Sequence, residues 1–128
     1  MEKVILVVDD SSTVRKFVAA SLNMKGFRVV TAGDGIEALE CMPAEKFDLI
    51  ILDLNMPDMD GFEFMRTLRE TPEYREIPII ILSSMTDLKN KDLALEMGAT
   101  AFLEKPLSTE AIQREVFRFV KTTIQYTG

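Results

Sequence analysis

The sequence has 128 residues, of which 47% are hydrophobic and 28% charged, as expected for one globular domain spanning residues 1–128. The net charge is −6, from 15 basic and 21 acidic residues without a basic cluster, which argues against direct binding to nucleic acid. No apolar run approaches the roughly 20 residues that span a bilayer. No signal-peptide pattern begins the chain and Cys41 has no disulfide partner, so a cytoplasmic protein away from the membrane is expected.

Five short apolar segments rich in Val and Ile recur at regular spacing and predict five β-strands. The segments are residues 4–8, 28–31, 49–52, 77–82 and 101–103. The first, third and fourth are apolar throughout rather than alternating, a pattern typical of strands that are covered on both faces in a parallel sheet.

Helical periodicity fills the intervals between the predicted strands. The first helix has Ser11 or Ser12 as its N-cap and ends at Gly26. Its inward face is predicted to consist of Val14, Phe17, Val18, Ser21 and Leu22. The second helix has a shorter stripe and ends at Pro43. That stripe consists of Ile36, Leu39 and Met42.

The third helix begins at Asp60-Gly61, and the fourth runs from a cap at Asp87 to Met97 and ends at Gly98. Ser108 caps the fifth. The inward stripes of the third and fifth helices are Phe62, Met65 and Leu68, and Ile112, Val116, Phe119 and Val120. Phe117 and Ile124 fall outside the last stripe and are either scattered exposed residues or part of a partner surface.

The order β-α is therefore repeated five times, which predicts an α/β fold: one parallel sheet with right-handed crossovers and helices on both faces. In such a sheet, ligands bind beyond the carboxyl ends of the strands. The segments around Met56, Pro57 and Met59, and from Arg69 to Pro78, are interpreted as a local turn and a solvated connection.

Three carboxylates are predicted to meet at that edge. Asp9 and Asp10 follow the first strand, and Asp53 follows the third. Two adjacent anions repel each other by about 4 kcal/mol at 4 Å and an effective dielectric near 20, so a cation is expected between them. Carboxylate, carbonyl and water oxygens are the ligands that Mg²⁺ prefers.

Ser83 and Ser84 end the fourth strand, and Lys105-Pro106 ends the fifth. Taken alone, Lys105 is a salt-bridge partner of the aspartates. Beside a hydroxyl and a metal ion, it is better interpreted as one of two cations that hold a phosphoryl group.

Four motifs give the chain a resemblance to a known family. They are VVDD at 7–10, LDLNMPDMDG at 52–61, IIILSS at 79–84 and GATAFLEKP at 98–106. Together they make nearly the whole sequence resemble a response-regulator receiver domain, similar to the single-domain chemotaxis regulators. The resemblance implies a flavodoxin-like (βα)5 three-layer sandwich with strand order 2-1-3-4-5.

The resemblance also implies roles for individual residues. Asp53 corresponds to the phospho-accepting aspartate. Asp10 and Asp53 ligate Mg²⁺ directly, with the backbone carbonyl of Asn55, while Asp9 acts mainly through bound water. Ser83 donates a hydrogen bond to the phosphoryl oxygens; Ser84 is its nearest competitor for that role, and the spacing from Pro78 favours Ser83.

The same resemblance implies further roles. Lys105 forms an ion pair with the phosphoryl oxygens, and Pro106 follows it where the family usually has a cis peptide bond. Phe102 corresponds to a switchable aromatic residue. Asn55 and Met85, each two residues past the acceptor or the hydroxyl, tune how readily water attacks the acyl phosphate.

The leading hypothesis is a phosphorylation-controlled binding module. Because the chain contains no histidine, the phosphohistidine donor is a separate partner, a sensor histidine kinase or a phosphotransfer protein. The output is predicted to be a protein contact through the fourth helix, fifth strand and fifth helix, by a monomer or a weak phosphorylation-dependent dimer.

The alternative is a Mg²⁺-dependent phosphohydrolase with Asp53 as its nucleophile, as in the haloacid-dehalogenase class. That chemistry requires an acid two residues on, where the chain has Asn55. An FMN carrier is disfavoured, because Asp9 and Asp10 stand where a phosphate-binding loop would be needed. A degenerate scaffold is disfavoured because every position of the acceptor site is filled.

Overall fold

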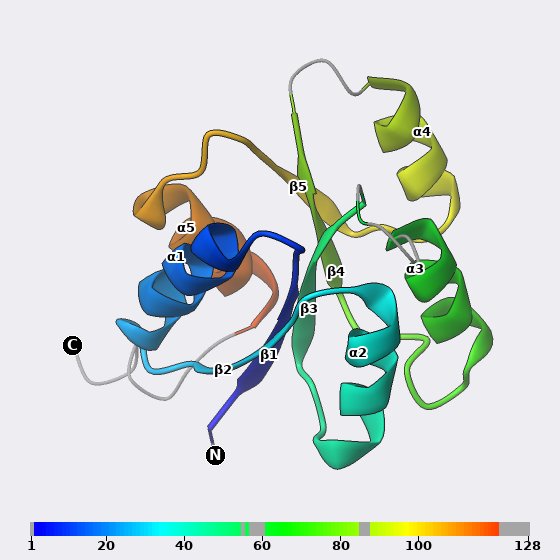
Figure 1. Cartoon of the computed structure of the whole chain (residues 1–128), viewed down its shortest axis with the longest axis horizontal. Helices are drawn as coiled ribbons and strands as arrows, with labels where there is room; N and C mark the ends of the chain where they lie inside the picture. The colour runs from blue at the N-terminus through cyan, green and yellow to red at the C-terminus, as the bar shows by residue number, and fades with distance from the viewer. Residues whose placement is uncertain (1, 55, 57–60, 85–87, 121–128) are drawn as a thin grey trace.

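The computed structural model describes residues 2–54, 56, 61–84 and 88–120, with only the backbone of 88 and 89. In this part of the chain, five parallel strands alternate with five α-helices (Figure 1). The strands are β1 (Val4–Val8), β2 (Arg28–Ala32), β3 (Leu49–Asp53), β4 (Ile79–Ser83) and β5 (Ala101–Glu104). The helices are α1 (Ser12–Asn23), α2 (Gly35–Cys41), α3 (Gly61–Glu70), α4 (Leu88–Glu96) and α5 (Thr109–Phe119), with a 3₁₀ turn at Met42–Ala44.

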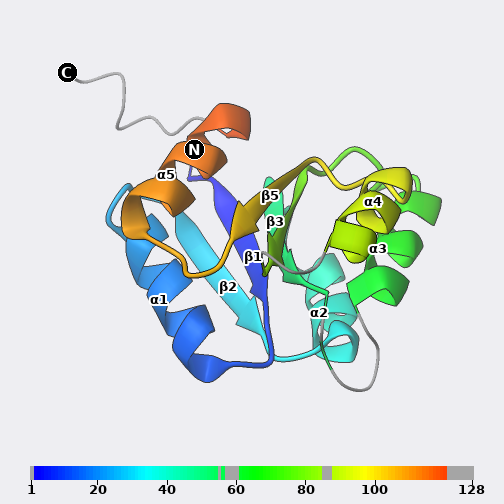
Figure 2. The ribbon, with the colours of Figure 1, turned by 90° about the horizontal axis from the view of Figure 1, so that it is seen from above.

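The sheet order is β2-β1-β3-β4-β5, which confirms the fold implied by the four motifs. Helices α1 and α5 cover one face of the sheet, and α2, α3 and α4 cover the other (Figures 1 and 2). Both layers bury apolar side chains against the sheet, so the domain has a core on each side of it.

The central strands supply both cores by alternation. Leu6, Ile50 and Ile81 belong to the core beneath α2, α3 and α4, whereas their neighbours in sequence belong to the core beneath α1 and α5. Every residue of β3 and β4 is buried, as are Ile5 to Val8 of β1. The prediction that these strands are covered on both faces is confirmed.

The N-caps predicted for α1 and α5 are confirmed, whereas α1 ends at Asn23, three residues before the predicted Gly26. Ser11, rather than Ser12, accepts a hydrogen bond from the Val14 N–H, and Ser108 accepts one from the Ala111 N–H. Gly98, which follows α4, has a φ of +102°, a conformation that favours glycine. The proposed caps Asp60 and Asp87 lie outside the described residues, as do Pro57, Met59 and Ile124.

The prediction that Phe17 and Ile36 lie in the core is wrong. Phe17 is 40% exposed and Ile36 is 51% exposed, because the buried faces of α1 and α2 centre on neighbouring positions. In α1 the buried residues are Val18, Ser21 and Leu22; in α2 they are Gly35 and Ala38. The predicted stripe of α1 was therefore too wide by one position, and the predicted stripe of α2 was displaced by one residue from the buried face.

Phe117, which the sequence left open between an exposed residue and a partner surface, packs inward. Its ring lies 5.3 Å from that of Phe27, centroid to centroid, and it joins the core beneath α1 and α5. Phe62 is only partly buried, and its neighbour Phe64 is fully buried. Among the described residues, no helix is both long enough and apolar enough to cross a membrane.

Candidate functional site

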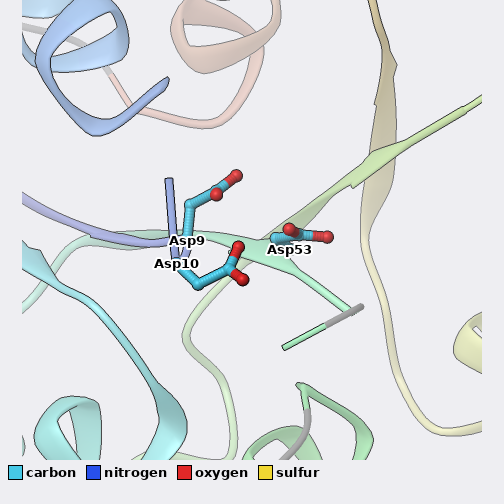
Figure 3. Close-up of side chains that lie close together, drawn as sticks. All are labelled: Asp9, Asp10 and Asp53. Atoms are coloured by element: carbon cyan, nitrogen blue, oxygen red, sulfur yellow. The ribbon is translucent and has the colours of Figure 1, made fainter. Parts of the chain in front are cut away.

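Three carboxylates meet at the carboxyl edge of the sheet. Asp9 follows the last residue of β1, and Asp53 is the last residue of the adjacent strand β3. One oxygen from each of Asp9, Asp10 and Asp53 lies within 4.8 Å of the others (Figure 3). Asp9 and Asp53 are buried, whereas Asp10 is exposed. The convergence predicted from the parallel topology is therefore present.

Asp9 is fully buried, and its two carboxylate oxygens differ in their surroundings. Oδ1 accepts a hydrogen bond of 2.8 Å from the Ser11 N–H, while Oδ2 has no hydrogen-bond partner in the described part of the chain. Burial raises the pKa of Asp9; the Ser11 N–H and Lys105 oppose this rise, and the charge of Asp10 adds to it. The buried carboxylate is thus only partly compensated by the protein.

Lys105 brings one positive charge to the cluster. Its Nζ lies 3.7 Å from Oδ2 of Asp9 and 3.8 Å from Oδ2 of Asp53. The Lys105–Pro106 peptide bond is cis, as the resemblance implied. Among the described residues of this cluster, one ammonium group stands against three carboxylates, which leaves an excess of negative charge.

The donor atoms fit a hard divalent cation. Mg²⁺ is held by a few carboxylate and carbonyl oxygens and keeps several waters in its octahedral shell. The cluster offers oxygen ligands only. One of them is Oδ2 of Asp9, which has an ion pair with Lys105 but accepts no hydrogen bond from the described residues, and the exposed Asp10 borders solvent where water ligands can stand. These residues therefore suit a magnesium ion better than a soft transition metal.

Ser83 and Ser84 at the end of β4 lie in different environments. Ser83 is 3% exposed, and its Oγ is buried without a hydrogen-bond partner in the described residues, whereas Ser84 is exposed. In the β3–β4 ladder Asp53 pairs with Leu82, so Ser83 stands one residue beyond the acceptor candidate. The geometry therefore favours Ser83 over Ser84 as the hydroxyl beside Asp53.

Phe102 lies on β5, partly buried, and packs against the core beneath α2, α3 and α4. It is not in the carboxylate cluster itself. Pro106 is exposed next to Lys105. Asn55 and Met85, to which the resemblance gave roles in ligation and water access, lie outside the described residues.

Two residues that support the site were not identified from the sequence. Arg15 of α1 donates a hydrogen bond of 2.7 Å from Nη1 to the backbone carbonyl of Asp9, which fixes the turn that carries the paired aspartates. At Gly61, a Cβ would stand 2.7 Å from the Asp53 carbonyl oxygen and 2.7 Å from Cα of Leu54. The glycine of the LDLNMPDMDG motif is therefore needed because α3 begins directly against the backbone of the acceptor candidate.

A doubly wound sheet that carries an acidic cluster, a lysine and a hydroxyl at the carboxyl ends of its strands has the groups needed to hold a divalent cation and a phosphoryl group. Residues 5–117 match the response regulator receiver domain family, and the chain belongs to that family. It is a receiver domain of the kind that two-component response regulators contain.

Relatives and solved structures agree with this assignment. The chemotaxis protein CheY4 of Vibrio cholerae superposes with a TM-score of 0.88 at 38% identity, covering 94% of this chain and all (100%) of that one. The receiver domain of the sensor histidine kinase PA1611 of Pseudomonas aeruginosa, solved with a magnesium ion coordinated in its active-site cleft, matches with a TM-score of 0.84 at 28% identity over 93% of this chain and 98% of that one.

A probable transcriptional regulator, ycf27 of Cyanophora paradoxa, is 36% identical over 122 residues, which cover 95% of this chain and 50% of that protein. The chain thus spans about half the length of the curated relatives it matches.

Proposed function

We propose that Asp53 accepts a phosphoryl group from the phosphohistidine of a sensor histidine kinase or phosphotransfer protein, and that residues 1–128 act as one phosphorylation-controlled receiver domain. The observation that carries the proposal is the position of the Asp53 carboxylate, buried beside two further carboxylates and the Lys105 ammonium, at a strand end where the buried Ser83 hydroxyl has no hydrogen-bond partner among the described residues. The single free Cys41 is consistent with the reducing cytoplasm, which we take as the location.

In the proposed transfer, a carboxylate oxygen of Asp53 forms a bond to phosphorus as the bond from phosphorus to the donor nitrogen breaks. A carboxylate is a weak nucleophile toward an anionic phosphoryl group, so the site must offset charge and hold the reactants in line. Lys105 supplies a positive charge near the Asp53 oxygens, and Ser83 supplies a hydroxyl whose proton is available to the incoming oxygens.

A magnesium ion is proposed as the cofactor, with Asp9, Asp10, Asp53 and the carbonyl of Asn55 as its ligands or water-mediated partners. When bound, it would neutralise part of the charge that develops on the phosphoryl oxygens. Asp9 is held by the Ser11 N–H, and its backbone is held by Arg15, so the paired aspartates are positioned before any ion arrives.

The proposed output is a change in the surface formed by α4, β5 and α5, to which a downstream protein or a second receiver binds. A phosphoryl group adds about −1.5 to −2 charge and new acceptor oxygens, which attract the Ser83 hydroxyl. Movement of Ser83, at the end of β4, alters the space beside β5, where Phe102 lies. This change favours an inward position of the Phe102 ring. Phe102 has no hydroxyl, so packing alone couples its ring to the site.

The phosphorylation itself is tested with acetyl phosphate and Mg²⁺, with the mass of the intact protein as the readout. We expect addition of one phosphoryl group to the wild type and to Asp92→Asn, an exposed carboxylate of α4, and none to Asp53→Asn. A phosphorylated Asp53→Asn variant would overturn the assignment. No turnover of a chromogenic phosphate ester is expected; sustained turnover that depends on Asp53 would instead favour the phosphohydrolase.

A further inference from the structure

Lys91, in α4, contacts two side chains of β5. Its Nζ donates a hydrogen bond of 3.1 Å to Oε1 of Glu104 and lies 5.6 Å from the centroid of the Phe102 ring. Phe102 and Glu104 are two positions apart on the strand and so face the same side of the sheet. An ammonium within about 6 Å of an aromatic centroid is attracted to the face of the ring. One cation therefore connects α4 to both residues.

The remainder of α4 is weakly attached. Of its described side chains, at 90–96, only Ala94 is fully buried, and Leu93 and Leu95 are 43% and 54% exposed. In that same range, Lys91 alone makes a hydrogen bond or ion pair through its side chain to another element. The turn after α4 is fastened separately, because Arg69 of α3 donates to the Gly98 carbonyl at 2.7 and 3.2 Å.

The residues that Lys91 contacts are directly connected to the carboxylate cluster. Glu104 pairs with Ser83 in the β4–β5 ladder. The next residue, Lys105, donates its backbone N–H to the Ser83 carbonyl at 2.8 Å and places its Nζ near Asp9 and Asp53. A shift of this strand end on phosphorylation would therefore change the position of the groups that hold α4.

We propose that Lys91 is a positioning residue that fastens α4 to β5 in the unphosphorylated conformation and thereby opposes the phosphorylated one. This inference rests on the proposed function. Lys91 contacts the face of Phe102 while the ring is partly buried, so movement of the ring further inward would break that contact. A contact that exists only in the unphosphorylated conformation stabilises that conformation. Removing the contact by mutation therefore shifts the equilibrium toward the phosphorylated conformation.

The test is the affinity for beryllofluoride, an acyl-phosphate mimic, in the presence of Mg²⁺, followed by NMR. Lys91→Ala should bind it about two- to tenfold more tightly than the wild type, since exposed ion pairs and cation–π contacts are each worth roughly this factor. Lys91→Arg should restore wild-type affinity, because guanidinium keeps both contacts. Lys46→Ala, which removes the same charge from an exposed position outside α4 and β5, should change nothing.

A second measurement separates this inference from the proposed function. Without beryllofluoride, amide hydrogen exchange at 91–96 should be faster in Lys91→Ala than in Lys46→Ala. If the wild type binds beryllofluoride and Lys91→Ala binds it no more tightly, the inference is overturned and the proposed function stands. If the wild type does not bind it at all, the proposed function is overturned, and unchanged exchange rates would then overturn the fastening of α4 as well.

Discussion

The ammonium group of Lys105 lies 3.8 Å from Oδ2 of Asp53, although β5 and β3 are not adjacent in the sheet. Strand β4 lies between them, so the lysine side chain extends across the end of β4, where the buried hydroxyl of Ser83 is located. The proposed acceptor, hydroxyl and cation thus come from three consecutive strands. This arrangement makes each contribution separately testable.

Mg²⁺ should bind with micromolar to millimolar affinity, and Asp10→Ala should abolish binding. Asp10 is exposed, so its removal leaves the core intact while the cluster loses one of its three carboxylates. Titration calorimetry of the wild type, Asp10→Ala and the control Asp92→Ala would measure this. A concentration of 100 times the dissociation constant should raise the free energy of unfolding by about 2.7 kcal/mol in the wild type. An unchanged titration of Asp10→Ala would contradict the assignment.

Gly61→Ala should destabilise the fold by about 2 kcal/mol and weaken Mg²⁺ binding. The added methyl group would stand 2.7 Å from the carbonyl oxygen of Asp53, so the end of β3 or the start of α3 must move. Gly33→Ala is the matched control for stability, because its Cβ would have ordinary contact, 3.4 Å, with Nη1 of Arg15. Urea denaturation measures the free energy of unfolding, and calorimetry measures Mg²⁺ affinity. Equal free energies of unfolding for Gly61→Ala and Gly33→Ala would show that the close approach at Gly61 is not required.

Arg69→Met should cost about 2–4 kcal/mol in the free energy of unfolding. The guanidinium donates to the carbonyls of Gly98, Arg75 and Ile77, and an apolar side chain leaves the partly buried ones without a donor. Burial lowers the pKa of Arg69, and Glu76 opposes this effect. Arg66→Met, an exposed position on the same helix, is the control for charge and helix propensity. If the denaturation midpoints of Arg69→Met and Arg66→Met shift equally, the hydrogen bonds from Arg69 to the three carbonyls contribute little to the free energy of unfolding.

Met85→Gln should shorten the lifetime of the phosphorylated protein. The thioether of methionine cannot orient a water molecule, whereas an amide two residues past the conserved hydroxyl can. Loss of the phosphoryl group after removal of the donor, followed by mass spectrometry, measures the half-life. Met24→Gln, at an exposed residue after α1, is the control. An unchanged half-life in Met85→Gln would show that this position does not regulate the attack of water.

The sequence predicted the elements that depend on local pattern. Buried strands such as β3 and β4 are uninterrupted apolar runs, and parallel strands place their carboxyl ends at one edge of the sheet, so Asp9 and Asp53 were expected at the same edge. The strand order came from the resemblance, since periodicity does not encode which strands pair.

Features that depend on packing between distant elements were not predicted. Phe17 and Ile36 were assigned to the core, because a stripe at helical spacing does not fix the rotation of the helix to within one residue. The structural roles of Arg15, Gly61 and Lys91 were not predicted, because they depend on contacts with the Asp9 carbonyl, with the backbone at Asp53 and with side chains of β5. None of these leaves a local signal in the sequence.

The hydrogen bond from the Lys105 N–H to the Ser83 carbonyl fixes the separation of two residues proposed to bind the same phosphoryl group. Backbone hydrogen bonds between β4 and β5 set that separation, and it does not depend on side chains at the surface. Residues on the outer faces of α4 and α5 can therefore be substituted, and can form contacts with new partners, without a change in the separation of Ser83 and Lys105.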